Sequence, residues 1–90
     1  MIVQNKSSYY TSRCRLWLDH NVLNHKGELS RLQEIIQEGN GNNIEQICEW
    51  IIDKVESTPL RTSQQEELLE NGKKIDYIQI AKALIKEHIL

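Results

Sequence analysis

Apolar residues recur along most of the chain at the three- and four-residue spacing that is typical of amphipathic helices. The clearest stripe predicts a helix over residues 44–57 and consists of Ile44, Ile47, Cys48, Ile51 and Val55. Shorter stripes predict further helices over residues 28–38, 64–71 and 77–89. Helices therefore account for most of the chain beyond residue 27.

The N-terminal third fits two interpretations. Its apolar residues keep helical spacing at Tyr10, Cys14 and Trp17, but strand-favouring residues also alternate from Tyr10 to Leu18. A lone strand would have no partner for its backbone hydrogen bonds in a chain that is otherwise helical. We therefore predict a helix that reaches His25, with an extended segment over residues 9–18 as the alternative. The predicted fold is all-α, a small bundle of four to five short helices.

Glycines and capping residues mark the expected helix ends. Glycine is favoured just past a helix because the left-handed conformation carries no steric penalty for it. On this basis helices are predicted to end before Gly27, Gly39 and Gly72. Three further residues have a Glu or Gln three positions later, the spacing of reciprocal capping at a helix start, and these are Asn43, Ser63 and Asp76.

Length and composition limit the class of protein. Ninety residues suit one domain, residues 1–90, and 39% apolar content is ordinary for a packed globular chain. No secretory signal and no apolar run long enough for a membrane span is visible, so we expect a cytoplasmic protein with two reduced cysteines and no membrane contact. The net charge of −2 supplies no overall basic field for nucleic acid.

Catalytic and metal-binding patterns do not stand out in the sequence. It has no nucleophile elbow, phosphate-binding loop, dinucleotide fingerprint or His-Glu-x-x-His pair. Cys14, His20, His25 and Cys48 are residue types that bind zinc. On a helix, however, His20 and His25 point away from each other. We therefore predict a protein that is not an enzyme and holds no metal or cofactor.

Residues 63–87 have the helix, short turn and helix outline of a DNA-binding helix-turn-helix. Residues 1–27 add a local basic excess, with four Lys or Arg against one Asp. Leu68 is bulky where the two helices should approach closely, and Lys73 stands where an apolar residue would turn inward. A nucleic-acid-binding regulator is therefore the second functional hypothesis and not the first.

The predicted helix over residues 44–57 offers a candidate protein-binding surface. Glu45, Glu49 and Asp53 follow one another at four-residue spacing, where like charges destabilise a helix by about 0.2–0.5 kcal/mol per pair. Trp50 projects from the flank of this helix, outside the apolar stripe. An aromatic residue beside carboxylates is typical of an interface centre, here with a basic protein partner.

An internal role for the same residues is the alternative. Arg13 and Arg15 could dock on these carboxylates while Trp50 packs beneath the N-terminal segment. This arrangement would also explain the uneven distribution of charge along the chain.

The last predicted helix has an apolar arc that covers about half its circumference, wider than the ~100° stripe of an ordinary surface helix. Such a helix lies either at the centre of its own bundle or between two subunits. A symmetric homodimer is the commonest way to cover such a face. The expected dimer contact consists of Ile80, Leu84 and Ile85.

These patterns predict a small cytosolic protein-interaction or regulatory module, such as an adaptor, an inhibitor or an immunity-type protein.

Overall fold

The computed structural model describes residues 6–59 and 62–89. Within these ranges the chain forms five α-helices, one short 3-10 helix and no strand. The elements are α1 (Ser8–Asn21), α2 (Lys26–Glu38), α3 (Ile44–Ser57), α4 (Ser63–Glu70), η1 (Gly72–Lys74) and α5 (Tyr77–His88). The predicted all-α bundle is confirmed, and residues 9–18 are helical rather than extended.

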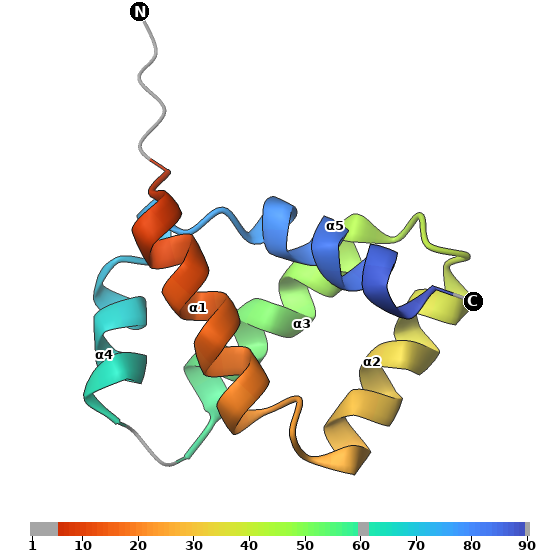
Figure 1. The fold of residues 1–90 in the computed structure, drawn as a ribbon, viewed down its shortest axis with the longest axis horizontal. Coiled ribbons are helices and arrows are strands. Elements are labelled where there is room, and N and C mark those ends of the chain that lie inside the picture. Colours follow the sequence, from red (N-terminus) through yellow and green to blue (C-terminus); the bar gives the residue numbers. More distant parts are fainter. Residues whose placement is uncertain (1–5, 60–61, 90) are drawn as a thin grey trace, which may run out of the picture.

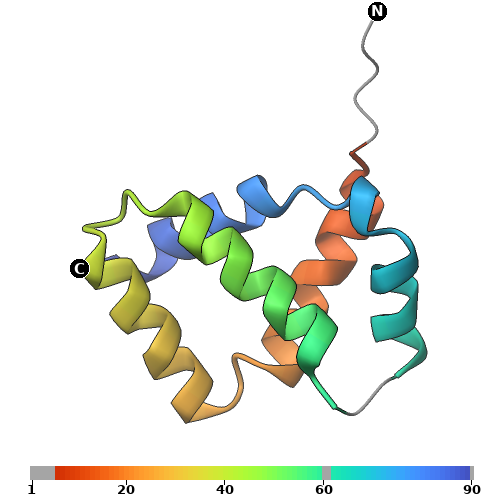
Figure 2. The same cartoon turned by 180° about the vertical axis from the view of Figure 1, so that it is seen from behind.

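The helices pack around a central pair, α3 and α5, which make the most extensive contact in the bundle. α2 packs against both of them at one end, and α4 packs against α1 and α3 at the other (Figure 1). α1 lies at the front of this view, whereas α3 lies at the front of the opposite view (Figure 2). One side of α3 therefore forms much of one face of the molecule.

One hydrophobic core joins all five α-helices. Every helix contributes at least one fully or almost fully buried apolar side chain, as does the segment before α5. These residues are Cys14, Trp17, Leu18, Val22, Leu32, Ile36, Ile47, Ile51, Val55, Leu68, Ile75, Ile80, Ala81, Leu84 and Ile85. The predicted stripe of α3 is thus the side that faces the core.

The first helix ends earlier than its residue pattern predicts. α1 stops at Asn21, the chain turns after it, and Val22 in the turn is buried with 2% exposure. α2 then begins at Lys26, so Gly27 is the second residue of a helix and the prediction of a helix end there is wrong. α2 does end before Gly39 as predicted, but Gly39 has a φ of −95°, and the left-handed conformation occurs at Asn40 and Gly41 instead.

The predicted caps are correct in part. Asp76 caps α5 with its side-chain oxygen, which accepts a hydrogen bond from the backbone N–H three residues later at 3.1 Å. At α4 the cap is Thr62 and not Ser63. Asn43 precedes α3 as predicted, but its side-chain amide donates to a carbonyl oxygen of α2 at 2.6 Å and makes no capping bond.

The broad apolar arc of α5 is explained by its central position in the bundle. Ile80, Leu84 and Ile85 are 3%, 0% and 8% exposed within the single chain. Side chains this deeply buried present almost no surface to a second copy. This burial argues against a dimer contact through these three residues, and the homodimer itself stays a prediction.

Candidate functional site

The predicted acidic residues share one side of α3. Glu45, Glu49 and Asp53 are all exposed, on the side of α3 away from the core stripe. We call these three residues the acidic ridge. Asp53 accepts a hydrogen bond from Ser57 Oγ at 3.1 Å. Glu45 and Glu49 form no hydrogen bond or ion pair with any residue in the ranges 6–59 and 62–89.

Trp50 lies on the flank of the acidic ridge that faces α2. Its indole is half-buried and packs against the edge of the core. Lys54 Nζ lies 5.7 Å from the centroid of the indole ring, and the same amine forms an ion pair with Glu28 of α2. Trp50 is therefore neither fully exposed nor fully buried. The amine of Lys54 and the edge of the core each cover part of its indole.

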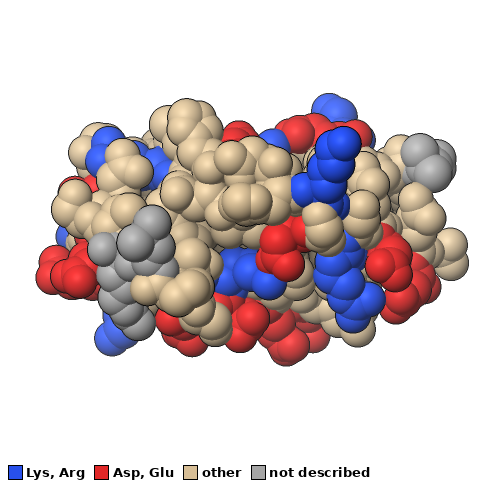
Figure 3. Space-filling model, turned by 90° about the horizontal axis from the view of Figure 1, so that it is seen from below, with Lys and Arg blue, Asp and Glu red and all other residues tan. Residues whose placement is uncertain are grey.

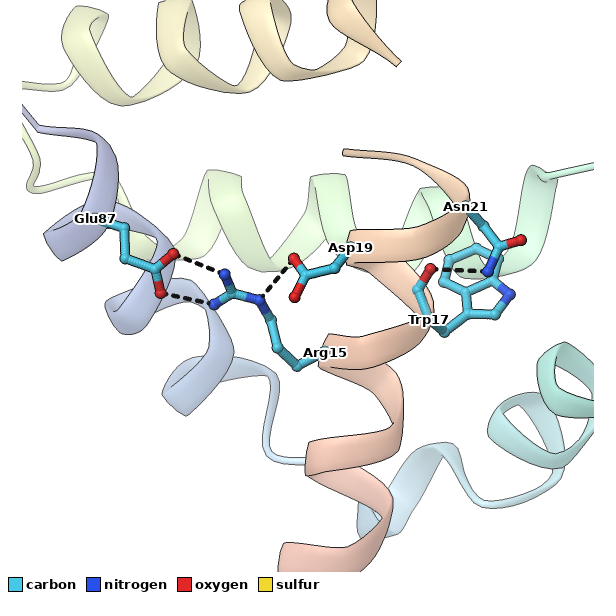
Figure 4. Close-up of polar contacts among 5 residues, drawn as sticks. All are labelled: Arg15, Trp17, Asp19, Asn21 and Glu87. Carbon is cyan, nitrogen blue, oxygen red and sulfur yellow. Dashed lines mark hydrogen bonds and ion pairs between the residues drawn. The ribbon is translucent and has the colours of Figure 1, made fainter. Parts of the chain in front are cut away.

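The arginines of α1 do not reach α3, so the predicted internal role for them is wrong. Arg13 Nε pairs with Glu67 Oε1 of α4 at 2.8 Å. The guanidinium of Arg15 donates to both carboxylate oxygens of Glu87 at 3.0 and 2.7 Å, and to Asp19 at 3.1 Å (Figure 4). The hydrogen bonds from Arg15 lower the pKa of Glu87. The acidic ridge keeps its charge without compensation from these arginines.

The nucleic-acid hypothesis gains no support from the packing. α4 lies against α1 and α3, whereas α5 lies mainly along α3, and the bulky Leu68 is buried in the core. Lys6 Nζ donates to the carbonyl oxygens of Lys73 and Ile75, both at 3.3 Å. In Figure 3, basic and acidic side chains alternate over the visible face. No continuous basic patch of the kind that binds phosphates is seen on that face.

A groove between α3 and α5 lies on the other flank of the acidic ridge. Its volume is about 580 Å³, and its lining residues are Ile44, Glu45, Cys48, Glu49, Ile78 and Lys82. Ile78 is 54% exposed and is the most exposed apolar residue of this groove. Sequence reasoning missed this feature because Ile78 fits the apolar arc of the last helix. A helical pattern does not reveal at which edge of an arc the packing stops.

Carboxylates dominate the electrostatics of the groove. The half-buried thiol of Cys48 has a raised pKa, first because of burial and then because of the nearby carboxylates of Asp76, Glu45 and Glu49. Lys82 is the cation among the lining residues. Cys14 provides a contrast, since complete burial raises its pKa to about 12. Both cysteines are reduced.

The described residues contain no cluster of three His, Cys, Asp or Glu side chains that could hold a metal ion. In the same part of the chain, no helix has the length and apolar character needed to cross a bilayer. No protein-family model, curated protein or solved structure matches this chain.

Proposed function

We propose that this chain is a small cytoplasmic protein-interaction module that regulates or bridges a partner protein and catalyses no reaction. Its binding surface is the outer face of α3, which combines the acidic ridge with Trp50 on one flank and the α3–α5 groove on the other. A partner with basic side chains fits this surface, because complementary charge accelerates encounter and selects the correct partner.

One observation carries the proposal. Glu45 and Glu49 are neighbours on α3, and both are exposed without an ion pair in the described part of the chain. Like charges at this spacing destabilise a helix by about 0.2–0.5 kcal/mol. The repulsion between Glu45 and Glu49 costs the helix stability, whereas a cationic partner would neutralise it.

Trp50 adds apolar area to the same face. Tryptophan is enriched among the residues that dominate binding energy, and a polar rim commonly surrounds the centre of an interface. Part of the indole is held against the core, so its orientation is already fixed before a partner arrives. Such preorganisation lowers the entropy that binding must overcome.

Affinity capture from lysate with Glu49→Lys tests the proposal. The substitution reverses a charge at the centre of the acidic ridge and touches no core residue. Glu38→Lys is the matched control, because Glu38 is also exposed and lies on α2. We expect Glu49→Lys to lose a protein that wild type and Glu38→Lys both retain, with equal helicity by circular dichroism. Equal capture by all three chains would exclude this face as the binding surface.

A further inference from the structure

The α3–α5 groove is a shallow depression, open to solvent, with one helix on each side. Glu45 and Glu49 lie one turn apart on the α3 wall, and Ile78 and Lys82 lie one turn apart on the α5 wall. Two packed helices leave between them a furrow into which side chains at three- and four-residue spacing fit. A helix lying along this furrow would contact both walls at once.

The floor of the groove is apolar over more than one helical turn. Ile44 and Cys48 are half-buried there, and Ile52 continues the row on α3 into a separate hollow. Leu69 and Tyr77 line that hollow together with the charged residues Glu56, Glu70, Lys73 and Lys74. The row spans eight residues, which is about 12 Å along α3 at 1.5 Å per residue. This length matches roughly two turns of a partner helix with apolar residues at i, i+4 and i+7.

The charges of the two walls specify the polar sides of such a helix. Glu45 and Glu49 line the α3 wall, and the carboxylate of Asp76 also lies near the Cys48 thiol. A partner therefore needs Lys or Arg on the side that meets α3. Lys82 on the opposite wall favours an acidic residue at that edge.

We infer that the α3–α5 groove binds an amphipathic helix of another protein, with its apolar side on Ile44, Cys48 and Ile78 and its basic side on Glu45 and Glu49. This inference rests on the proposed function and adds the shape and chemistry of the partner. Arg13 and Arg15 are already paired with carboxylates of their own chain, so they are not available to the acidic ridge of a second copy.

A synthetic amphipathic helix of Leu and Lys, about five turns or 18 residues long, is a suitable probe. Its controls are a Leu–Glu peptide of the same pattern and a scrambled Leu–Lys peptide of the same composition. Anisotropy of labelled peptide gives the affinity, and the alkylation rate of Cys48 reports whether the groove is covered. We expect the Leu–Lys helix to bind at least about tenfold more tightly than either control and to slow alkylation of Cys48.

Two matched variants locate the binding site on the molecule. Ile78→Gln removes the apolar wall residue, and Leu16→Gln removes an apolar residue of α1 that is 56% exposed, against 54% for Ile78. Both residues are on the surface, so helicity should be unchanged. Burial of a fully exposed Ile side chain corresponds to a factor of about 10–100 in affinity, and the 54% of Ile78 that is still exposed corresponds to about 3–10. Ile78→Gln should lose most of that factor and Leu16→Gln none.

The outcomes separate this inference from the proposed function. Equal binding of the Leu–Lys and Leu–Glu helices, or equal losses in Ile78→Gln and Leu16→Gln, would overturn the inference. So would an unchanged alkylation rate of Cys48 at saturating peptide. If a lysate partner is lost by Glu49→Lys but retained by Ile78→Gln, the acidic ridge binds it without the groove, and only the proposed function survives.

Discussion

Glu49→Lys should make the chain more stable, although we expect it to abolish binding. In the native helix Glu49 has a like charge on each side, at Glu45 and Asp53. Each such pair at four-residue spacing destabilises a helix by about 0.2–0.5 kcal/mol, and an opposite-charge pair stabilises it by a similar amount. The substitution converts both pairs at once.

The expected gain follows from this arithmetic. Each pair changes by about 0.4–1 kcal/mol, so two pairs give about 0.8–2 kcal/mol at most. Exposed pairs usually contribute at the low end of such ranges, since solvent and side-chain entropy weaken them. A gain near 1 kcal/mol raises the melting temperature of a domain of this size by about 4–8 °C.

Thermal unfolding followed by far-ultraviolet circular dichroism measures the effect. Glu49→Gln removes the repulsion without adding attraction, so it should give about half the gain of Glu49→Lys. In roughly 1 M salt, where the screening length is about 3 Å, the three melting temperatures should converge. A melting temperature of Glu49→Lys at or below that of wild type in low salt would refute the reasoning. Glu49 would then support the fold, and the acidic ridge would need no partner to explain it.

Four further predictions concern other parts of the fold. Gly27→Ala should stabilise the chain by about 0.4–1 kcal/mol, because a methyl group there meets nothing within 4 Å and the position is helical. Gly41→Ala should destabilise it by about 1–2 kcal/mol, because φ is +77° at Gly41, and thermal melts of both variants check these opposite signs. Under native conditions a thiol reagent should modify Cys48 slowly and Cys14 only after unfolding, as mass spectrometry of the alkylated peptides will show. The lowered pKa of Glu87 means that its ion pair stabilises the fold above about pH 4.3, the ordinary pKa of Glu, and is lost as the pH falls through the lower folded value. The free energy of unfolding of Glu87→Gln should therefore fall less than that of wild type as the pH is lowered. The difference should be less than about 1 kcal/mol, because the carboxylate is half-exposed, and an equal fall in both proteins would contradict this assignment.

The sequence by itself determined α2 to α5 to within a few residues, and the side of α3 that faces the core. The core stripe of α3 is the one its periodicity predicts, and its helix bounds agree with the structure. The acidic ridge was also predictable, because positions four apart on one helix are neighbours whatever the rest of the chain does. These are local properties, fixed by the geometry of a single helix.

The end of α1 shows where local signals become ambiguous. A cation followed by Gly27 resembles a helix end, yet it stands at the start of α2. The chain turns before this point, and Val22 at the turn is buried in the core. Burial of this kind depends on elements far along the chain, so the residues near Gly27 in the sequence are not enough to predict where α1 ends.

Only the tertiary structure decided which apolar and charged side chains meet. Ile80, Leu84 and Ile85 fill the core of their own chain, while Ile78 of the same helix stays on the surface and lines the α3–α5 groove. Arg15 pairs with Glu87 of α5, which lies 72 residues further along the chain, and not with a carboxylate of α3. Periodicity gives the direction of a side chain on its helix, but the partner in that direction depends on how the helices pack.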